Sequence, residues 1–281
     1  SGGGSQVKER RSLFILCALG FGFVFLYLPI LSLVVFSFNA SRLVTVWDVH
    51  NSPTLKWYFA LFNNDEILDA AWISLKVAVI NATGASILGT LAGFSLSRFG
   101  RFRGRMLFNA MTTAPLVMPE VITGLSLLLT FVAMEQVFGW PAGRGMTTIT
   151  IAHMTFSMAF VAVVIQSRLG TFDIALEEAA MDLGAHPAKV FFVITLPIIF
   201  PAILSGWLLA FTMSWDDLVI SSFASGPGSS TLPMVIFSKV RLGVSPEINV
   251  LATLTISFVT LIMVGVAWWM ARAARLEKAG R

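Results

Sequence analysis

The chain has 281 residues, of which 56% are hydrophobic and only 12% are charged, with a formal net charge of +4 at pH 7. Soluble domains are typically about 45–50% apolar and about 25% charged, so this composition excludes a soluble globule. A single cysteine, Cys17, excludes a disulfide within the chain, and the three histidines lack any metal-ligand spacing, so we expect no metal site.

Six apolar stretches are long enough to cross the hydrocarbon core of a bilayer, which takes about 20 residues in a helix. We expect them at about 13–38, 70–96, 106–132, 147–167, 197–223 and 248–271. The expected fold is therefore all-α and integral to the membrane, with one transmembrane domain at residues 13–271. Cytoplasmic tails at 1–12 and 272–281 flank it, and the glycine-rich start at 1–5 is expected to be a flexible extension.

The distribution of positive charge predicts the orientation of the chain. Most of the 19 lysines and arginines lie in the two tails, in the connection after the second span and in the connection after the fourth span. Cytoplasmic connections carry the excess of lysine and arginine, so both termini are expected in the cytoplasm. A clustered basic face for nucleic acid is not expected, because the charges are spread along membrane connections.

Three carboxylates stand in or near the predicted spans. Glu120 follows Pro119, which interrupts the third span, and Asp216 and Asp217 lie in the fifth. An acidic residue at the bilayer centre costs roughly 2.5–3.5 kcal/mol, and breaks inside the membrane tend to line cavities. We therefore expect Glu120, Asp216 and Asp217 to serve a path for a cationic solute. Because adjacent residues on a helix point about 100° apart, one of the two aspartates is expected to meet the solute and the other to hold a neighbouring span or the partner subunit. Structural pairing with Lys76, which lies inside a span, is the alternative.

Two tryptophans are candidates for contact with the same solute. Trp47 lies in the long outer connection, and Trp215 directly precedes Asp216. A cation over an aromatic face gains about 0.5–2 kcal/mol, so either ring suits a positively charged solute. For Trp47, a place in the aromatic belt at the membrane–water boundary is the alternative.

The connection at residues 171–197 carries the most specific spacing in the sequence. Helix-forming residues surround Glu178, and Gly184 stands where a left-handed cap is expected to end the helix. Pro187 can then open a second short helix as its first residue. The fixed positions of the pattern are Glu178, Ala179, Ala180, Gly184, Ile194, Leu196 and Pro197.

This spacing, EAA-x3-G-x9-I-x-LP, resembles the signature loop of permease subunits of binding-protein-dependent ABC importers. The resemblance implies a six-helix importer permease of the type I, MetI-like fold, moving its solute by alternating access. It also implies that a cytoplasmic ATPase docks on Glu178, Ala179, Ala180, Gly184, Leu196 and Pro197. ATP and magnesium would then bind to that partner, with no cofactor in this chain, since the sequence has no G-x4-G-K-[ST] motif.

Further motifs are similar to those of the polyamine branch of this family. They are the segments 114–124, 214–217, 226–228, 231–233 and 244–249, with Glu120 standing where that branch typically has aspartate. The likeness implies a putrescine or spermidine importer in the bacterial inner membrane, with putrescine the expected solute. The implied partners are a second related permease subunit, two ATPase subunits, a periplasmic polyamine-binding protein and membrane lipid.

Two alternatives remain open from the sequence. A permease for another solute would share the signature loop, although three acidic residues disfavour an anion. An integral membrane enzyme would need a polar catalytic cluster, which the scattered histidines do not supply. We therefore expect a transport subunit without enzymatic activity of its own.

Overall fold

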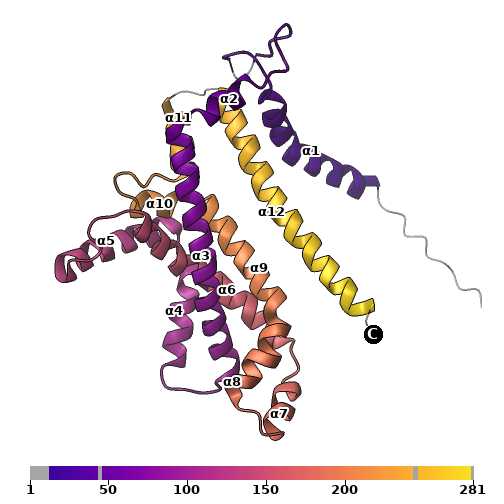
Figure 1. Cartoon of the computed structure of the whole chain (residues 1–281), viewed down its shortest axis with the longest axis vertical. Helices are drawn as coiled ribbons and strands as arrows, with labels where there is room; N and C mark the ends of the chain where they lie inside the picture. Colours follow the sequence, from indigo (N-terminus) through magenta and orange to yellow (C-terminus); the bar gives the residue numbers. More distant parts are fainter. Residues whose placement is uncertain (1–12, 44–45, 243–245, 280–281) are drawn as a thin grey trace, which may run out of the picture. The chain divides into compact units, whose positions relative to one another are not determined.

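The computed structural model describes residues 13–43, 46–242 and 246–279, and these are mostly helical. The chain divides into two compact units, which we describe separately. The first comprises residues 1–63 and 239–258, and the second comprises residues 64–238 and 259–281. Figure 1 shows the helices with the labels used below.

The first unit contains α1 (Leu13–Phe36), α2 (Lys56–Phe62), the end of α11 (Leu232–Leu242) and the first part of α12 (Pro246–Ala279). The segment between α1 and α2 folds around Asn39, which is buried. Its side chain accepts a hydrogen bond from the backbone amide of Asp48 (3.0 Å) and donates one to the carbonyl of Val46 (2.7 Å). These bonds satisfy a buried amide and give the connection between α1 and α2 a fixed fold.

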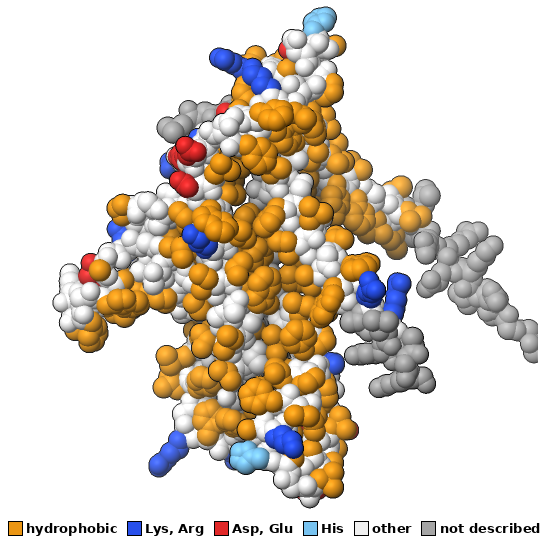
Figure 2. Space-filling model, viewed as in Figure 1, with side chains coloured by type: hydrophobic (Ala, Val, Ile, Leu, Met, Phe, Trp, Pro, Cys, Tyr) orange, Lys and Arg blue, Asp and Glu red, His pale blue; other side chains and the backbone are white. Residues whose placement is uncertain are grey.

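The second unit contains α3 (Asp65–Arg98), α4 (Arg105–Val117), α5 (Glu120–Phe138), α6 (Met146–Gly170), α7 (Ala175–Asp182), α8 (Pro187–Val190), the π-helix η1 (Phe191–Thr195), α9 (Leu196–Trp215), α10 (Val219–Ala224), most of α11 and the second part of α12. Helices α3, α6 and α9 pack against one another at its centre (Figure 1). Helix α10 packs against α5 and α6. Apolar side chains cover much of the face of this unit that Figure 2 shows, as expected for a surface in contact with lipid.

Glycines on α3 let this helix approach α6 closely. A Cβ atom on Gly89 would lie 2.6 Å from Cβ of Val161 and 2.8 Å from the carbonyl oxygen of Met158. A Cβ atom on Gly93 would lie 2.8 Å from the carbonyl oxygen of Ala162. Such distances exclude a larger residue unless the helices separate. Small residues therefore set the spacing of α3 and α6, as they commonly do between membrane helices.

A buried amide joins the three central helices. Nδ2 of Asn81 on α3 donates to the carbonyl oxygen of Ala210 on α9 (2.9 Å) and to Oγ of Ser157 on α6 (3.3 Å). Asn81 is fully buried. A polar group in the hydrocarbon layer must find its partners inside the protein, so these bonds help to fix the register of the three helices.

Six helical segments in the described part of the chain are long and apolar enough to cross a membrane, as the sequence predicted. They are Phe14–Phe36, Asp65–Arg98, Glu120–Phe138, Met146–Gly170, Pro187–Trp215 and Pro246–Arg272.

Two of the predicted spans have the wrong limits. The predicted third span, 106–132, is split, because α4 ends at Val117 and α5 begins at Glu120. Pro119 has an extended, non-helical backbone and no amide hydrogen to donate to α4, so the helix is interrupted there. The predicted fifth span, 197–223, begins earlier, at Pro187, and ends earlier, at Trp215.

Candidate functional site

The early end of α9 is caused by the two aspartates that follow it. Asp216 is the C-terminal cap of α9, and α10 begins at Val219. The Asp217 carboxylate accepts hydrogen bonds from the backbone amides of Ser221 (2.7 Å) and Ile220 (3.3 Å). Amides at the start of a helix have no partner within it, so this carboxylate stabilises a new helix at the expense of the old one.

Asp217 is also tied to α6 through His153. Nε2 of His153 lies 3.1 Å from Oδ2 of Asp217 and 3.1 Å from Oγ of Ser221. Its Nδ1 lies 2.7 Å from Oγ of Ser214. The side chains of His153 and Asp217 retain only 3% and 10% of their exposed surface. Both carboxylate oxygens of Asp217 are therefore engaged inside the protein.

Asp216 and Glu120, in contrast, are exposed, and each lies at one of the two helix breaks. Glu120 opens α5 directly after the break at Pro119. Helices α5 and α10 pack closely, since a Cβ atom on Gly124 would lie 2.6 Å from the ring of Phe223. The break before α5 and the break after α9 thus each present one exposed carboxylate to the same region.

This pair of carboxylates suits a positively charged solute. Two like charges raise each other's energy, and a cation between them removes that penalty. Lys76, the alternative partner considered from the sequence, lies instead with its Nζ 4.9 Å above the ring of Trp72 on the same helix. Both Lys76 and Trp72 are exposed, a placement that is typical of the membrane–water boundary.

The two candidate tryptophans lie in different units. Trp215 is buried on α9, where its ring stacks on Phe211 at 6.0 Å and 14°. Phe211 stacks in turn on Trp207 at 5.4 Å and 12°. Trp47 belongs to the first unit, where its ring meets Phe36 edge-on at 5.8 Å. Contact of either ring with a solute stays a prediction.

The predicted signature loop forms the two helices expected from its sequence. Helix α7 ends in a left-handed residue, Gly184, with φ at +86°. The amide of Gly184 donates to the carbonyl of Met181 (2.9 Å), and the amide of Ala185 donates to that of Ala180 (3.1 Å). This pair of bonds is the Schellman motif, which satisfies the last carbonyls of a helix. Pro187 then opens α8 as its first residue, as predicted.

Among the residues that the structure describes, helix α7 and its C-terminal cap leave two leucines exposed. Leu176 is 52% exposed and Leu183 is 90% exposed. Glu178 and Ala179 are also exposed, and Ala180 is half-buried. Leu196 and Pro197 form the first turn of α9, the former half-buried and the latter exposed. A small apolar face of this kind can receive a partner surface without first removing any covering segment.

Sequence reasoning missed a buried ion pair behind this loop. Nε of Arg98 at the end of α3 lies 2.9 Å from Oε2 of Glu177 on α7. Oγ1 of Thr195 donates a hydrogen bond to Oε1 of Glu177 (2.7 Å). Arg98 is one of the positive charges in the connection after the second predicted span, and the signature spacing includes Glu178 but not Glu177. No spacing in the sequence connects these three positions.

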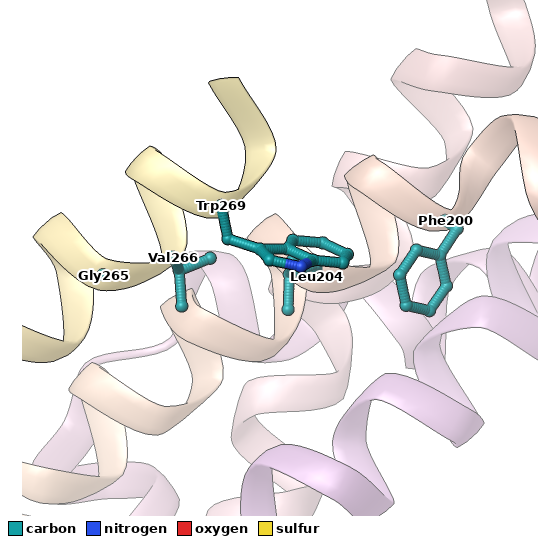
Figure 3. Close-up of a pocket in the computed structure, with 5 residues that line it drawn as sticks. All are labelled: Phe200, Leu204, Gly265, Val266 and Trp269. Atoms are coloured by element: carbon teal, nitrogen blue, oxygen red, sulfur yellow. The ribbon is translucent and has the colours of Figure 1, made fainter. Parts of the chain in front are cut away.

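A groove on another face of the second unit is apolar. It has a volume of about 310 Å³ and lies between α9 and the second part of α12, where Phe200, Leu204, Gly265, Val266 and Trp269 line it. Figure 3 shows the rings of Phe200 and Trp269 beside it. Its lining carries no charged side chain, so it does not fit a cationic solute.

Comparisons with known proteins identify the family. The family model described as "binding-protein-dependent transport system inner membrane component" matches residues 85–276. The chain is 59% identical over 268 residues to the putrescine transport system permease protein PotI of Escherichia coli K12, covering 95% of this chain and 93% of PotI. It is 40% identical over 250 residues to the spermidine/putrescine transport system permease protein PotC of the same strain, covering 89% and 90%.

Solved structures of ABC transporters share the fold. A chain of a bacterial transporter that imports alginate matches with a TM-score of 0.71 at 16% identity, covering 96% of this chain and 99% of that one. A chain of the MetNI methionine transporter matches with a TM-score of 0.61 at 16% identity, covering 74% and 95%. The fold is therefore that of an ABC importer permease.

The chain belongs to the family of inner membrane components of binding-protein-dependent transport systems. It is a multi-pass membrane permease and not an enzyme, so the enzyme considered from the sequence is set aside. The recognition of this family from the signature loop is confirmed.

Proposed function

We propose that this chain is a permease subunit of an ATP-driven polyamine importer, with putrescine as the solute. The high identity to PotI over nearly the full length supports this solute, as does the 40% identity to PotC. The observation that carries the proposal is the pair of exposed carboxylates, Asp216 and Glu120, beside two helix breaks. Breaks of this kind line solute paths in membrane proteins.

The charge of the solute fits this pair. Alkyl ammonium groups such as that of lysine have pKa values of about 10.4, so putrescine carries two positive charges at neutral pH. Glu120 and Asp216 offer one negative charge each, and Asp217 is held by His153. In this proposal, Asp217 positions the path and Trp215 shapes its wall. Trp47 belongs to the outer entrance.

The importer is proposed to contain four membrane-associated subunits and a soluble receptor. A second related permease completes the path, two ATPase subunits bind ATP and magnesium, and a periplasmic protein delivers the polyamine. One ATPase docks on Glu178, Ala179, Ala180, Gly184, Leu196 and Pro197, within the coupling loop at 171–197. The complex lies in the bacterial inner membrane, with both termini of this chain in the cytoplasm. Residues 13–271 act as one transmembrane domain.

Uptake of radiolabelled putrescine by the assembled importer tests the proposal. Glu120→Gln and Asp216→Asn remove one charge each with little change in shape, and we expect each to reduce uptake at least about tenfold, as 1.4 kcal/mol of lost affinity would. Asp69→Asn is the matched control, since Asp69 is an exposed acid on α3 outside the path. Assembly with the ATPase should be unchanged in all three variants.

Competition with unlabelled solutes distinguishes the polyamine from the alternatives. An excess of unlabelled putrescine should abolish uptake of the label, whereas methionine and sulfate should not. If the importer transported labelled methionine or sulfate and not putrescine, the proposal of putrescine as the solute would be wrong. Parental uptake in both Glu120→Gln and Asp216→Asn would show that these carboxylates do not serve a cation.

A further inference from the structure

Three side chains from separate elements meet behind the coupling loop. Arg98 closes the last turn of α3, Glu177 lies on α7, and Thr195 ends the π-helix η1. Glu177 joins the other two, since one of its oxygens lies 2.9 Å from Nε of Arg98 and the other accepts the hydroxyl of Thr195 at 2.7 Å. We call this group the Arg98–Glu177–Thr195 link.

The link is shielded from water. The side chains of Arg98 and Glu177 keep 13% and 9% of their exposed surface, and Thr195 keeps 1%. The ring of Phe172, which precedes α7, lies 5.4 Å from Cζ of Arg98 and covers the guanidinium. An ion pair is screened far less in such a place than at the surface. Removing one partner would leave the other charge buried without compensation.

Each end of the link continues into a central helix of the second unit. Arg98 belongs to α3, which is joined through Asn81 to both α6 and α9. Thr195 directly precedes α9, whose opposite end is capped by Asp216. The exposed apolar face of α7, with Leu176 and Leu183, lies on the same short helix as Glu177. Glu177 therefore stands between the proposed docking face and the helix that ends at the proposed path.

The connection from α7 to α9 by the chain itself is less direct. It runs through the turn at Gly184, the four residues of α8 and the five residues of η1. A π-helix has a wider and less regular turn than an α-helix, and π-helical turns are frequent at functional sites. Pro187–Trp215 is one helical segment, so along the chain a displacement of α7 reaches α9 only through the turn at Gly184. The Arg98–Glu177–Thr195 link is a second contact that bypasses this turn.

We propose that Arg98, Glu177 and Thr195 are positioning residues that carry the movement of α7 into α3 and α9 during ATP-driven transport. This rests on the proposed function only in that an ATPase drives α7. None of the three residues touches the solute. Breaking the link uncouples ATP hydrolysis from transport and leaves docking of the ATPase intact, because the exposed face of α7 is unchanged.

The first experiment measures the number of putrescine molecules transported per ATP hydrolysed by the assembled importer. Glu177→Gln keeps an acceptor for Thr195 and removes the charge, Arg98→Met removes the guanidinium, and Thr195→Val removes the hydroxyl. We expect the ratio to fall at least about fivefold in the first two variants, within the usual range of coupling between sites. The matched controls are Asp69→Asn on α3 and Arg101→Met after α3, both exposed and outside the coupling loop.

A double variant tests whether the residues act as one unit. Residues in one network show non-additive effects. The double variant Arg98→Met with Glu177→Gln should therefore lower the ratio of putrescine transported to ATP hydrolysed no further than the worse of the two single variants does. The proposal would be overturned if the losses of Arg98→Met and Glu177→Gln added up in the double variant. It would also be overturned if neither single variant changed the ratio of putrescine transported to ATP hydrolysed. If ATPase docking, measured by co-purification, fell in parallel with putrescine uptake, the three residues would serve only the folding of the loop. Thr195→Val creates no unpaired charge. The transport ratio can therefore still be measured with this variant if a charge variant does not assemble.

A second readout is independent of the solute. A nitroxide label at Ser222→Cys, in a Cys17→Ser background, reports on α10 from an exposed position. Its spectrum should change when ATP binds to the parental complex and should not change in Glu177→Gln. If the parent importer does not transport putrescine but its label responds to ATP and that of Glu177→Gln does not, the proposed solute fails and the link stands. A full response in Glu177→Gln would refute the link whatever the solute is.

Discussion

Nε2 of His153 on α6 lies 3.1 Å from Oδ2 of Asp217, which follows the end of α9. This contact joins two helices that are far apart in the sequence. The same carboxylate accepts the amide of Ser221 at 2.7 Å. Adjacent Asp216 makes neither contact and is exposed. Two neighbouring aspartates therefore have different surroundings, because the first ends α9 and the second starts α10.

The first prediction separates these two aspartates by stability. Asp217→Ala leaves the amides of Ile220 and Ser221 without their acceptor and removes one partner of His153, and hydrogen bonds to a charged group are worth about 1.5–3 kcal/mol each. We expect its thermal unfolding midpoint in detergent to fall by several degrees. Asp216→Ala should stay close to the parent, since exposed substitutions usually change stability by no more than about 0.5 kcal/mol. Equal shifts in the two variants would contradict the assignment.

The second prediction concerns the turn at Gly184. Its φ of +86° is strained for a β-branched residue, at a cost of roughly 1–3 kcal/mol. We expect Gly184→Val to displace α7 and reduce ATP-dependent uptake about tenfold, as about 1.4 kcal/mol would. Gly184→Asn is the matched control, because asparagine tolerates the left-handed region. Normal uptake in Gly184→Val would argue against a role for this turn in docking.

The third prediction concerns the spacing of α3 and α6. Gly89→Ala adds a methyl group that would lie 2.8 Å from the carbonyl of Met158, and overpacking typically costs about 1–3 kcal/mol. We expect a lower unfolding midpoint and reduced yield of the assembled complex. Gly22→Ala on α1 is the control, since its added methyl meets nothing within 4 Å. A stable Gly89→Ala variant would show that the two helices can separate without penalty.

The sequence predicted the elements that depend on local pattern. Apolar length predicted six spans, and the residues around Gly184 and Pro187 predicted the turn and the second helix of the loop. Both are properties of short stretches of chain. The prolines were recognised as an interruption, but α5 was not predicted to start as a separate helix at Glu120.

What the sequence did not predict depends on contacts between distant segments. Glu177 meets Arg98 across 79 positions because α3 and α7 are brought together by the fold. Adjacent residues on a helix point about 100° apart, so the sequence predicted different roles for Asp216 and Asp217. Which aspartate has which role follows from His153 on another helix, and spacing alone does not show that contact. Apolar periodicity is uninformative here, since membrane helices are apolar on all sides.

The last prediction concerns orientation in the membrane. If both termini are cytoplasmic, the connection between α1 and α2 faces outside, and Val49 within it is 77% exposed. In a Cys17→Ser background, Val49→Cys should react with a membrane-impermeant maleimide added to spheroplasts, and Ala279→Cys should not. Both variants should react after permeabilisation, which serves as the control for reactivity. Labelling of Ala279→Cys in sealed spheroplasts would reverse the orientation inferred from the positive charges, because the tail and the outer connection would then have exchanged sides.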